Sequence, residues 1–309
     1  MAYSISTFCR RLVSLGFPQE LLHSGVPLSA CTSFRIGGPC DLLCEPTCER
    51  EAALLLQAAA DEGIPVAIIG NGTNLLVRDG GIRGVVLRMK GNADGIRMTD
   101  DLSLTAPAGV SLAQLAAFAA AHGLDGLVPL SGIPGTLGGA VVMNAGAYGG
   151  AMAQIVTAAE GIDMNGQPFI LSHDELDFAY RHSALSDKEM LVTRVSFRLF
   201  PGKTEELRER MAVLARQRRE KQPLEFPSAG STFKRPAGAF AAKLIDECGL
   251  RGFSVGGAMV SEKHAGFVIN YHEASAADVL RLMAVIEARV FDHAGIHLEP
   301  EIRILGEDL

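Results

Sequence analysis

The chain has 309 residues, of which 48% are hydrophobic and 20% charged, and it contains 34 glycines. This composition excludes a disordered or fibrous protein, and the length indicates two or three domains. The net charge of -7 is spread along the chain, which argues against a surface devoted to nucleic acid or anionic lipid.

No run of about 18 apolar residues occurs, and the first residues lack a signal-peptide pattern, so we expect a soluble, cytoplasmic protein. Cys40, Cys44 and Cys48 share a four-residue spacing, but no second pair or histidines completes a zinc set. We therefore expect no metal, and we interpret residues 40–44 as a buried strand whose thiols are reduced.

The first third of the chain alternates helix and strand signals: a helix over 49–62 and strands over 66–69 and 84–89. A second block begins near Leu102 and includes a helix over 111–122, capped by Ser111. Strands follow over 155–200, with a hairpin signal at 163–166.

A charged helix over 204–221 marks a change in composition, which places a domain boundary near Gly202. The remaining signals predict a small α+β domain with helices over 241–248 and 275–293 and strands over 253–260, 267–271 and 301–305. We expect three domains, at residues 1–97, 98–201 and 202–309.

Two glycine-rich segments are candidate phosphate-binding loops. The first, Gly70 to Leu75, lacks the third glycine and the following helix of a Rossmann motif, and it reads as a strand–loop–strand nest or a plain turn. In the second, residues 131–140, Pro134 is expected at a first helical position, where unpaired N–H groups bind phosphate. Small residues at 144–150 would fit a flat ring, so the two loops suit one extended dinucleotide.

Seven short segments occur in a fixed order: TSFRIGG (32–38), GNGTNLL (70–76), GIPG (132–135), NAGA (144–147), YRHS (180–183), AGSTFK (229–234) and LEPE (298–301). Together they resemble the UDP-N-acetylenolpyruvoylglucosamine reductase family over nearly the whole chain. The short span after His182 lacks a longer inserted loop, which matches the shorter type II branch.

The resemblance implies an α+β protein with an FAD-binding fold of the vanillyl-alcohol oxidase (PCMH) type. Residues 1–97 and 98–201 would form two α/β subdomains, and 202–309 the substrate-binding domain, with the last strand free to return to the FAD domain. It also implies noncovalent FAD, held by Arg35, Gly70, Asn71, Gly72, Thr73, Asn74, Leu75, Ser131, Gly132, Ile133, Pro134, Gly135, Gly138, Gly139, Ala140, Asn144, Ala145, Gly146 and Ala147.

The implied activity is that of UDP-N-acetylmuramate dehydrogenase. NADPH reduces FAD, and the flavin reduces UDP-N-acetylenolpyruvoylglucosamine to UDP-N-acetylmuramate in peptidoglycan synthesis, on which cell wall, cell shape and cell division depend. The expected partners are small molecules, the UDP-sugar and NADPH, without nucleic acid or membrane, and we expect a monomer.

This reaction needs a cation for the substrate carboxylate and an acid for the adjacent carbon. By resemblance, Arg181 is the cation, Ser231 the proton donor and Glu301 the second residue on the carboxylate side. Glu301 would be protonated, with a pKa raised by burial and neighbours, or would act through an intervening hydrogen bond. From the local sequence alone, the surface salt-bridge interpretation of Arg181 is favoured over a catalytic one, Ser231 reads equally as a cap, and Glu299 is a nearby decoy. The implied substrate-binding residues are Tyr180, Arg181, Lys221, Lys234, Arg235 and Arg251.

Two other functions fit parts of the pattern. One is a different FAD-linked oxidoreductase of the same fold that uses oxygen or another acceptor. The other is a non-enzymatic, nucleotide-binding regulator. The set of Arg181, Ser231 and Glu301 favours the reductase.

Overall fold

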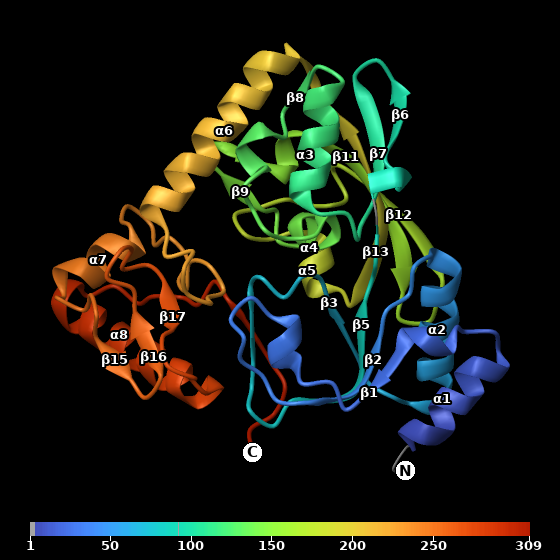
Figure 1. Cartoon of the computed structure of the whole chain (residues 1–309), viewed down its shortest axis with the longest axis horizontal. Helices are drawn as coiled ribbons and strands as arrows, with labels where there is room; N and C mark the ends of the chain where they lie inside the picture. The colour runs from blue at the N-terminus through green and yellow to red at the C-terminus, as the bar shows by residue number, and fades with distance from the viewer. Residues whose placement is uncertain (1–3, 92) are drawn as a thin grey trace. The chain divides into compact units, whose positions relative to one another are not determined.

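The computed structural model describes residues 4–91 and 93–309, which form two compact units (Figure 1). Unit 1 contains the described parts of 1–24, 42–71 and 84–216, and unit 2 contains Gly25–Asp41, Gly72–Arg83 and Gln217–Leu309. The predicted boundaries at 97 and 201 both fall within unit 1, so the division into three domains stays a prediction. No helix within the described residues is long and apolar enough to cross a bilayer.

The first sheet of unit 1 has the strand order β1-β2-β5-β3. Its strands are β1 (Leu22–Ser24), β2 (Cys40–Cys44), β5 (Ile82–Arg88) and β3 (Val66–Ile69), with helices α1 (Ile5–Ser14) and α2 (Glu49–Glu62). Strand β3 is parallel to β5, with Ile69 opposite Arg88. The apolar faces of α1 and α2 pack on this sheet through Phe8, Leu12 and Leu55, which are fully buried.

The second sheet of unit 1 is antiparallel, in the order β12-β11-β13-β7-β6. Its strands are β6 (Arg97–Asp100), β7 (Ser103–Pro107), β11 (Val156–Asp163), β12 (Pro168–Ser172) and β13 (Met190–Arg198). The predicted hairpin is confirmed, since Gly166 adopts a φ of 77° in the turn between β11 and β12. Figure 1 shows α3 beside this sheet.

The smaller elements of unit 1 complete its core. They are α3 (Leu112–Ala121), α4 (Leu137–Val142), α5 (Ala184–Asp187), and the short pairs β8 (Leu124–Asp125) with β14 (Phe200–Pro201) and β9 (Gly146–Ala147) with β10 (Gly150–Ala151). Single 3-10 turns of unit 1 lie at Gln19–Leu21, Ala93–Gly95, Val128–Leu130 and Met152–Gln154, and another, Leu28–Cys31, lies in unit 2.

The sequence predicts where two helices of unit 1 begin, and the structure confirms one of these two starts. Ser111 caps α3 as predicted, because its side chain accepts a hydrogen bond from the Gln114 amide in a capping box. Pro134 does not occupy a first helical position: α4 begins at Leu137 with Thr136 as its N-cap. The interpretation of Pro134 as a helix start is therefore wrong, because the chain makes a further turn before the helix.

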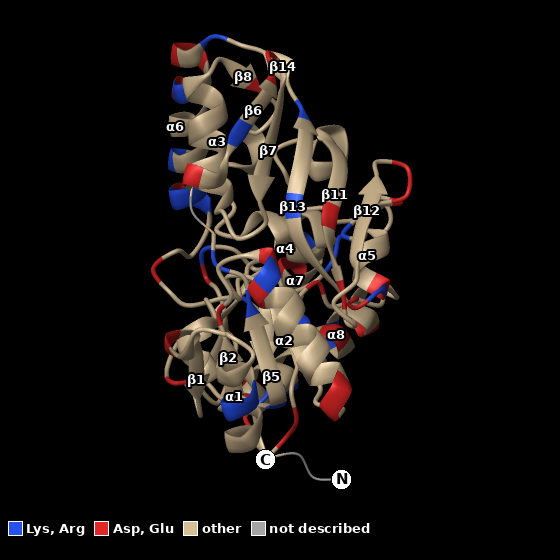
Figure 2. Ribbon diagram, turned by 90° about the vertical axis from the view of Figure 1, so that its right-hand side faces the viewer, with Lys and Arg blue, Asp and Glu red and all other residues tan. Residues whose placement is uncertain are grey.

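Helix α6 (Thr204–Lys221) has the bounds that the sequence predicts. Figure 2 shows charged residues of both signs along it. Glu205 and Glu206 lie in its first turn and Arg218, Arg219 and Lys221 in its last, an arrangement that complements the helix dipole.

Unit 2 combines a parallel pair, β4 (Leu75–Val77) and β18 (Arg303–Leu305), with an antiparallel sheet of β15 (Ser254–Val255), β16 (Ala258–Val260) and β17 (Val268–Asn270). Its helices are α7 (Ala241–Glu247) and α8 (Ala276–Ala294). One apolar cluster joins these elements, with Phe34, Leu76 and Leu282 fully or almost fully buried.

Two predicted strands of unit 2 need correction. The strand expected over 253–260 is a hairpin, β15 and β16, because Gly256 turns the chain with a φ of 55°. The final strand begins at Arg303 instead of residue 301, so Glu301 precedes it.

Asp79 connects the segment after β4 to α8 through hydrogen bonds. Its two carboxylate oxygens accept hydrogen bonds from the amides of Ala276 and Ala277, at 2.8 and 3.0 Å. These amides belong to the first turn of the helix, which has no intrahelical acceptors for them.

Candidate functional site

The two glycine-rich loops lie side by side in unit 1. The Asn71 side-chain amide donates to the Pro134 carbonyl oxygen at 3.2 Å. A Cβ placed on Gly70 would stand 2.5 Å from Thr136 Oγ1, so glycine is needed there for the loops to approach. The structure therefore brings together two segments that are about 60 residues apart in the sequence.

Small residues at and before the start of α4 have different surroundings. Gly138 donates its amide to the Ala108 carbonyl at 2.8 Å, and a Cβ on it would lie 3.0 Å from Ala108 Cβ, so this glycine packs against the core. Gly139 is exposed. The Ser131 hydroxyl donates to the Val128 carbonyl at 2.8 Å, within its own turn.

The later part of the first loop belongs to unit 2. Gly72 has a φ of +62°, and a Cβ on it would overlap the Cys31 carbonyl oxygen. The Ser33 amide donates to the Gly72 carbonyl at 3.2 Å, and the Ser33 hydroxyl donates to the Ser228 carbonyl at 2.6 Å. Segment 32–38, in which Arg35 is exposed with a φ of 54°, is thus in contact with both the loop and the serine segment.

Arg181 lies at the tip of a tight turn in unit 1, closed by hydrogen bonds between Ala179 and His182. Its φ of 54° is uncommon for a residue with a side chain, and such strain is concentrated at functional sites. Nη1 donates to the Gly146 carbonyl at 3.3 Å, and the guanidinium lies 5.2 Å from the centre of the Tyr180 ring. The turn therefore presents Arg181 beside the predicted flavin segment 144–147.

Asn144 connects that segment to the Arg181 turn. Its side-chain nitrogen donates to the Ala179 carbonyl at 2.8 Å, and its side-chain oxygen accepts from the Ala153 amide at 3.0 Å. Only 8% of the residue is exposed. The side chain thus supports the local backbone, while flavin contact by Asn144 stays a prediction.

Ser231 and Glu301 lie on neighbouring segments of unit 2. The Glu301 amide donates to the Thr232 carbonyl at 2.8 Å, and the Lys234 amide donates to the Glu299 carbonyl at 2.8 Å. An isolated antiparallel bridge joins Phe233 and Pro300 between them. Ser231 is exposed and Glu301 is half-buried, so the backbone pairing brings together two predicted acids that are 70 residues apart.

Thr232, the residue after the serine, faces the interior. It is 2% exposed, its hydroxyl accepts from the Val268 amide at 3.0 Å, and its own amide donates to the Gly266 carbonyl at 2.9 Å. Ser231, by contrast, is exposed. Thr232 is therefore a structural residue that fixes the serine segment.

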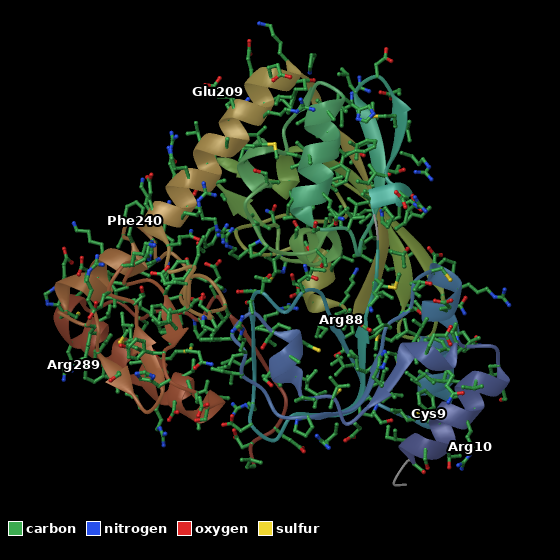
Figure 3. The ribbon with its side chains drawn as sticks, in the orientation of Figure 1. Cys9, Arg10, Arg88, Glu209, Phe240 and Arg289 are labelled. Carbon is green, nitrogen blue, oxygen red and sulfur yellow. The ribbon has the colours of Figure 1, made fainter. Side chains whose placement is uncertain are left out.

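Two of the predicted substrate-binding cations, Lys234 and Arg235, contact other groups of unit 2. Lys234 Nζ lies 3.2 Å from a Glu299 carboxylate oxygen. The Arg235 guanidinium lies 4.4 Å from the centre of the Phe240 ring, which is labelled in Figure 3. Lys221 is exposed at the end of α6.

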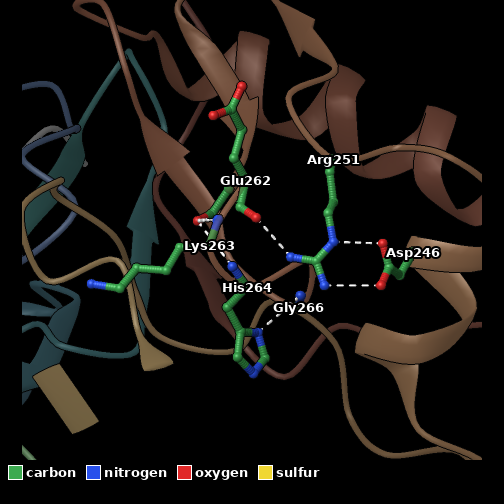
Figure 4. A network of polar contacts seen from close by, with 7 residues as sticks. Asp246, Arg251, Glu262, Lys263, His264 and Gly266 are labelled. Carbon is green, nitrogen blue, oxygen red and sulfur yellow. Dashed lines mark hydrogen bonds and ion pairs between the residues drawn. The ribbon is translucent and has the colours of Figure 1, made fainter. Parts of the chain in front are cut away.

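Arg251 is held in a network within unit 2 (Figure 4). Nε and Nη2 donate to the two carboxylate oxygens of Asp246 at 2.5 and 2.9 Å, and Nη1 donates to the Glu262 carbonyl at 2.7 Å. The Asp246 carboxylate raises the pKa of Arg251. Substrate contact by Arg251 stays a prediction, and the observed contacts hold the loop that leads to Gly266.

His264 lies in the same loop and is neutral at physiological pH. Burial lowers its pKa, and nearby Arg251 adds to that effect. Nδ1 accepts from the Gly266 amide at 3.1 Å, which assigns the proton to Nε2. The loop whose Gly266 carbonyl accepts from the Thr232 amide is therefore held by a hydrogen bond from Arg251 and by hydrogen bonds within the loop.

Glu45 of unit 1 was not singled out by the sequence reading. Its side chain is 6% exposed, and it accepts from Arg88 of β5, labelled in Figure 3, and lies 2.8 Å from Lys90. Burial alone would raise its pKa, but the hydrogen bonds from Lys90 and Arg88 outweigh burial, so the pKa of Glu45 is lowered. A charged residue directly after the apolar strand 40–44 is the signal that could have identified it.

The paired loops fit a dinucleotide cofactor. Gly139 exposes its backbone, Gly70 leaves room for Thr136, and the Asn71 contact fixes the spacing between the loops. Backbone N–H groups at such glycines bind phosphate oxygens.

Family profiles match the two parts of the chain that carry these features. Residues 40–172 match an FAD binding domain, and residues 222–305 match the C-terminal domain of UDP-N-acetylenolpyruvoylglucosamine reductase. The predicted FAD cofactor and fold class are thereby confirmed.

Whole-chain relatives give the same result. UDP-N-acetylenolpyruvoylglucosamine reductase of Caldanaerobacter subterraneus is 48% identical over 93% of this chain and 94% of its own length. The enzyme of Agathobacter rectalis is 48% identical over 94% of this chain and 96% of its own length. The crystal structure of the Thermus caldophilus reductase (MurB) is 37% identical, with a TM-score of 0.76, over 91% of this chain and 98% of that chain. The chain therefore belongs to the UDP-N-acetylenolpyruvoylglucosamine reductase family and is an FAD-dependent oxidoreductase of peptidoglycan synthesis.

Proposed function

We propose that this chain uses NADPH to reduce UDP-N-acetylenolpyruvoylglucosamine to UDP-N-acetylmuramate. The observation that carries the proposal is the backbone pairing that brings Ser231 beside Glu301 in unit 2, next to the residues of the first flavin loop. A reductase that adds hydride to a carbon–carbon double bond needs such acids, because a proton must reach the carbon that does not receive hydride.

When bound, FAD supplies the hydride that it has taken from NADPH. Arg181 is proposed to pair with the carboxylate of the enolpyruvyl group, where negative charge accumulates as hydride arrives. The planar guanidinium suits a carboxylate because two parallel hydrogen bonds fix its orientation.

Ser231 is proposed to donate the proton to the carbon next to that carboxylate. A serine hydroxyl is a weak acid, but the enolate-like charge on the substrate makes the receiving carbon strongly basic. The buried neighbour Thr232 holds the segment in place, so the hydroxyl is oriented before the reaction.

Glu301 is proposed to assist from the carboxylate side. An ionised Glu301 would repel the developing negative charge, so the residue acts in its protonated form or through an intervening hydrogen bond. We also propose that the protein works in the cytoplasm, where NADPH and UDP-sugars are available.

The test is consumption of NADPH by the purified holoenzyme with and without the enolpyruvyl sugar nucleotide. We expect oxidation only when that substrate is present, together with a product heavier by two hydrogen atoms in mass spectrometry. UDP-N-acetylglucosamine, which lacks the enolpyruvyl group, is the matched control. Oxidation of NADPH that depends on oxygen and ignores the sugar nucleotide would contradict the proposal and identify a different FAD-linked oxidoreductase.

A further inference from the structure

Asn74 lies in the predicted flavin loop, but its side chain contacts the C-terminal segment of unit 2. Its side-chain amide donates to the Glu301 carbonyl oxygen at 3.1 Å. Its own carbonyl accepts from the Arg303 amide at 2.9 Å. Asn74 thus hydrogen-bonds on both sides of Ile302.

These contacts extend the β4–β18 pair toward the proposed acid. The parallel ladder starts where Leu75 faces Arg303, and Glu301 lies beyond the end of β18. The β4–β18 ladder, as the described residues form it, does not include Glu301. At Glu301 one hydrogen bond from the Asn74 side chain takes the place of a backbone ladder contact.

The Glu301 backbone is consequently held from two directions. Its amide donates to the Thr232 carbonyl, in the segment that carries Ser231, and its carbonyl accepts from Asn74, in the flavin loop. With both polar backbone groups bound, the direction of the Cα–Cβ bond of Glu301 is fixed. Pro300 before it restricts the chain further, because its ring fixes φ.

We propose that Asn74 is a positioning residue for Glu301, which couples the flavin loop to the proposed acid pair. This inference rests on the proposed role of Glu301. Because a misplacement of about 1 Å at a reacting group can cost about 100-fold in rate, loss of the Asn74 hydrogen bond should slow the step that uses Glu301. Flavin reduction by NADPH does not use that step and should stay normal.

The experiment compares Asn74→Ala with Asn71→Ala in the FAD-loaded protein, by stopped-flow absorbance of the bound flavin. The two asparagines are three positions apart in one loop, and each donates to a distant carbonyl, Glu301 for Asn74 and Pro134 for Asn71. For Asn74→Ala we expect reduction by NADPH within about twofold of wild type and reoxidation by the enolpyruvyl substrate slowed about 10- to 100-fold. For Asn71→Ala, whose side chain contacts the second flavin loop, we expect weaker FAD binding.

Glu301→Gln and the double variant Asn74→Ala/Glu301→Gln distinguish the proposed role of Glu301 from the positioning role of Asn74. If Asn74 acts through Glu301, the double variant reoxidises no more slowly than Glu301→Gln alone. Normal reoxidation in Glu301→Gln would contradict the proposed role of Glu301. Slow reoxidation in Glu301→Gln with normal reoxidation in Asn74→Ala would overturn only the positioning role.

Loss of FAD from Asn74→Ala, with both half-reactions reduced in proportion, would also overturn the inference, because Asn74 would then be a cofactor ligand. If the alanine variant yields too little folded protein, Asn74→Ser keeps a shorter donor. We expect it to reoxidise at a rate between those of Asn74→Ala and wild type, and a rate equal to wild type at full FAD occupancy would contradict the inference.

Discussion

The flavin loops of unit 1 and the acid segments of unit 2 are constructed differently. In unit 1, glycine at position 139 exposes backbone, glycine at position 70 lets the loops approach, and one asparagine sets the distance between them. In unit 2, Ser231 and Glu301 depend on backbone pairing between remote segments and on the buried side chain of Thr232. A cofactor recognised through its phosphates needs backbone amides, whereas proton transfer needs individually placed side chains, so damage to each region should affect a different half of the reaction.

The largest expected effect is that of Ser231→Ala, which tests the acid region alone. Because the proton is needed only after hydride has left the flavin, reduction by NADPH should be near normal. Reoxidation by the enolpyruvyl substrate should be slower by about 10² to 10⁴, the range for removal of a general acid. Stopped-flow absorbance of the flavin measures both phases.

Thr232→Ser is the control, since it keeps the buried hydroxyl that accepts from Val268. Normal reoxidation of Ser231→Ala would exclude Ser231 as the donor. A bound water would then be the next candidate, because the hydroxyl of Thr232 is buried.

Glu45→Gln tests whether unit 1 depends on a charged side chain near its flavin loop. Arg88, which it binds, lies opposite Ile69, the residue before Gly70. Removing a nearly buried carboxylate beside two cations should lower the free energy of unfolding by about 2 kcal/mol. Urea denaturation measures this, and Glu20→Gln on the exposed surface is the control, for which we expect no change.

The difference in the free energy of unfolding between wild type and Glu45→Gln should depend on pH. The pKa of Glu45 is lowered in the folded protein, so its contribution is complete above the ordinary value of 4.5 and is lost as the pH falls through the folded pKa. The difference in stability between wild type and Glu45→Gln should therefore shrink as the pH is lowered from about 7 to about 3. A difference that grew on acidification would contradict this assignment.

Gly70→Ala has the smallest expected effect and tests the flavin region alone. The new methyl group would press on Thr136 Oγ1, so the loops should separate slightly and FAD should bind about tenfold more weakly, or about 1.4 kcal/mol. Titration of the apoprotein with FAD measures it. Thr136→Ala in the same background removes the clashing oxygen and should restore much of the affinity. Unchanged affinity in Gly70→Ala would mean that this contact does not set the spacing of the loops.

Gly72 is a poorer site for this test, since a side chain there would collide with the backbone at Cys31 and disturb unit 2 as well.

Regular elements could be predicted from the sequence where local signals agree. The bounds of α2, β3 and α6 match the predictions, because apolar periodicity, charge distribution and flanking glycine or proline residues all end at the same positions. The prediction failed at Pro134, where an N1 preference was outweighed by an extra turn before Leu137. It failed again at residues 253–260, where the turn at Gly256 divides a continuous apolar pattern.

Some features of the candidate site could likewise be predicted from the sequence, and others could not. Glycine spacing identified both loops, since the requirement for glycine is local, and the structure places them together. The partners of Asn74, Asp79 and Glu45 could not be predicted, because each contact joins residues distant in sequence or depends on which side chain the fold buries. The family resemblance supplied the roles of Arg181, Ser231 and Glu301, which local sequence could not assign.

The way in which unit 2 is assembled has a consequence for synthesis on the ribosome. Its segments 25–41 and 72–83 pack with 217–309, and the Arg78–Asp308 ion pair joins residues 230 positions apart. Strand β4 pairs in parallel with β18, which lies far later in the sequence. Non-local pairing of this kind forms late, so we expect the half of the flavin loop that starts at Gly72 to stay unfixed until β18 has been synthesised. A nascent chain stalled before β18 should therefore hold no flavin.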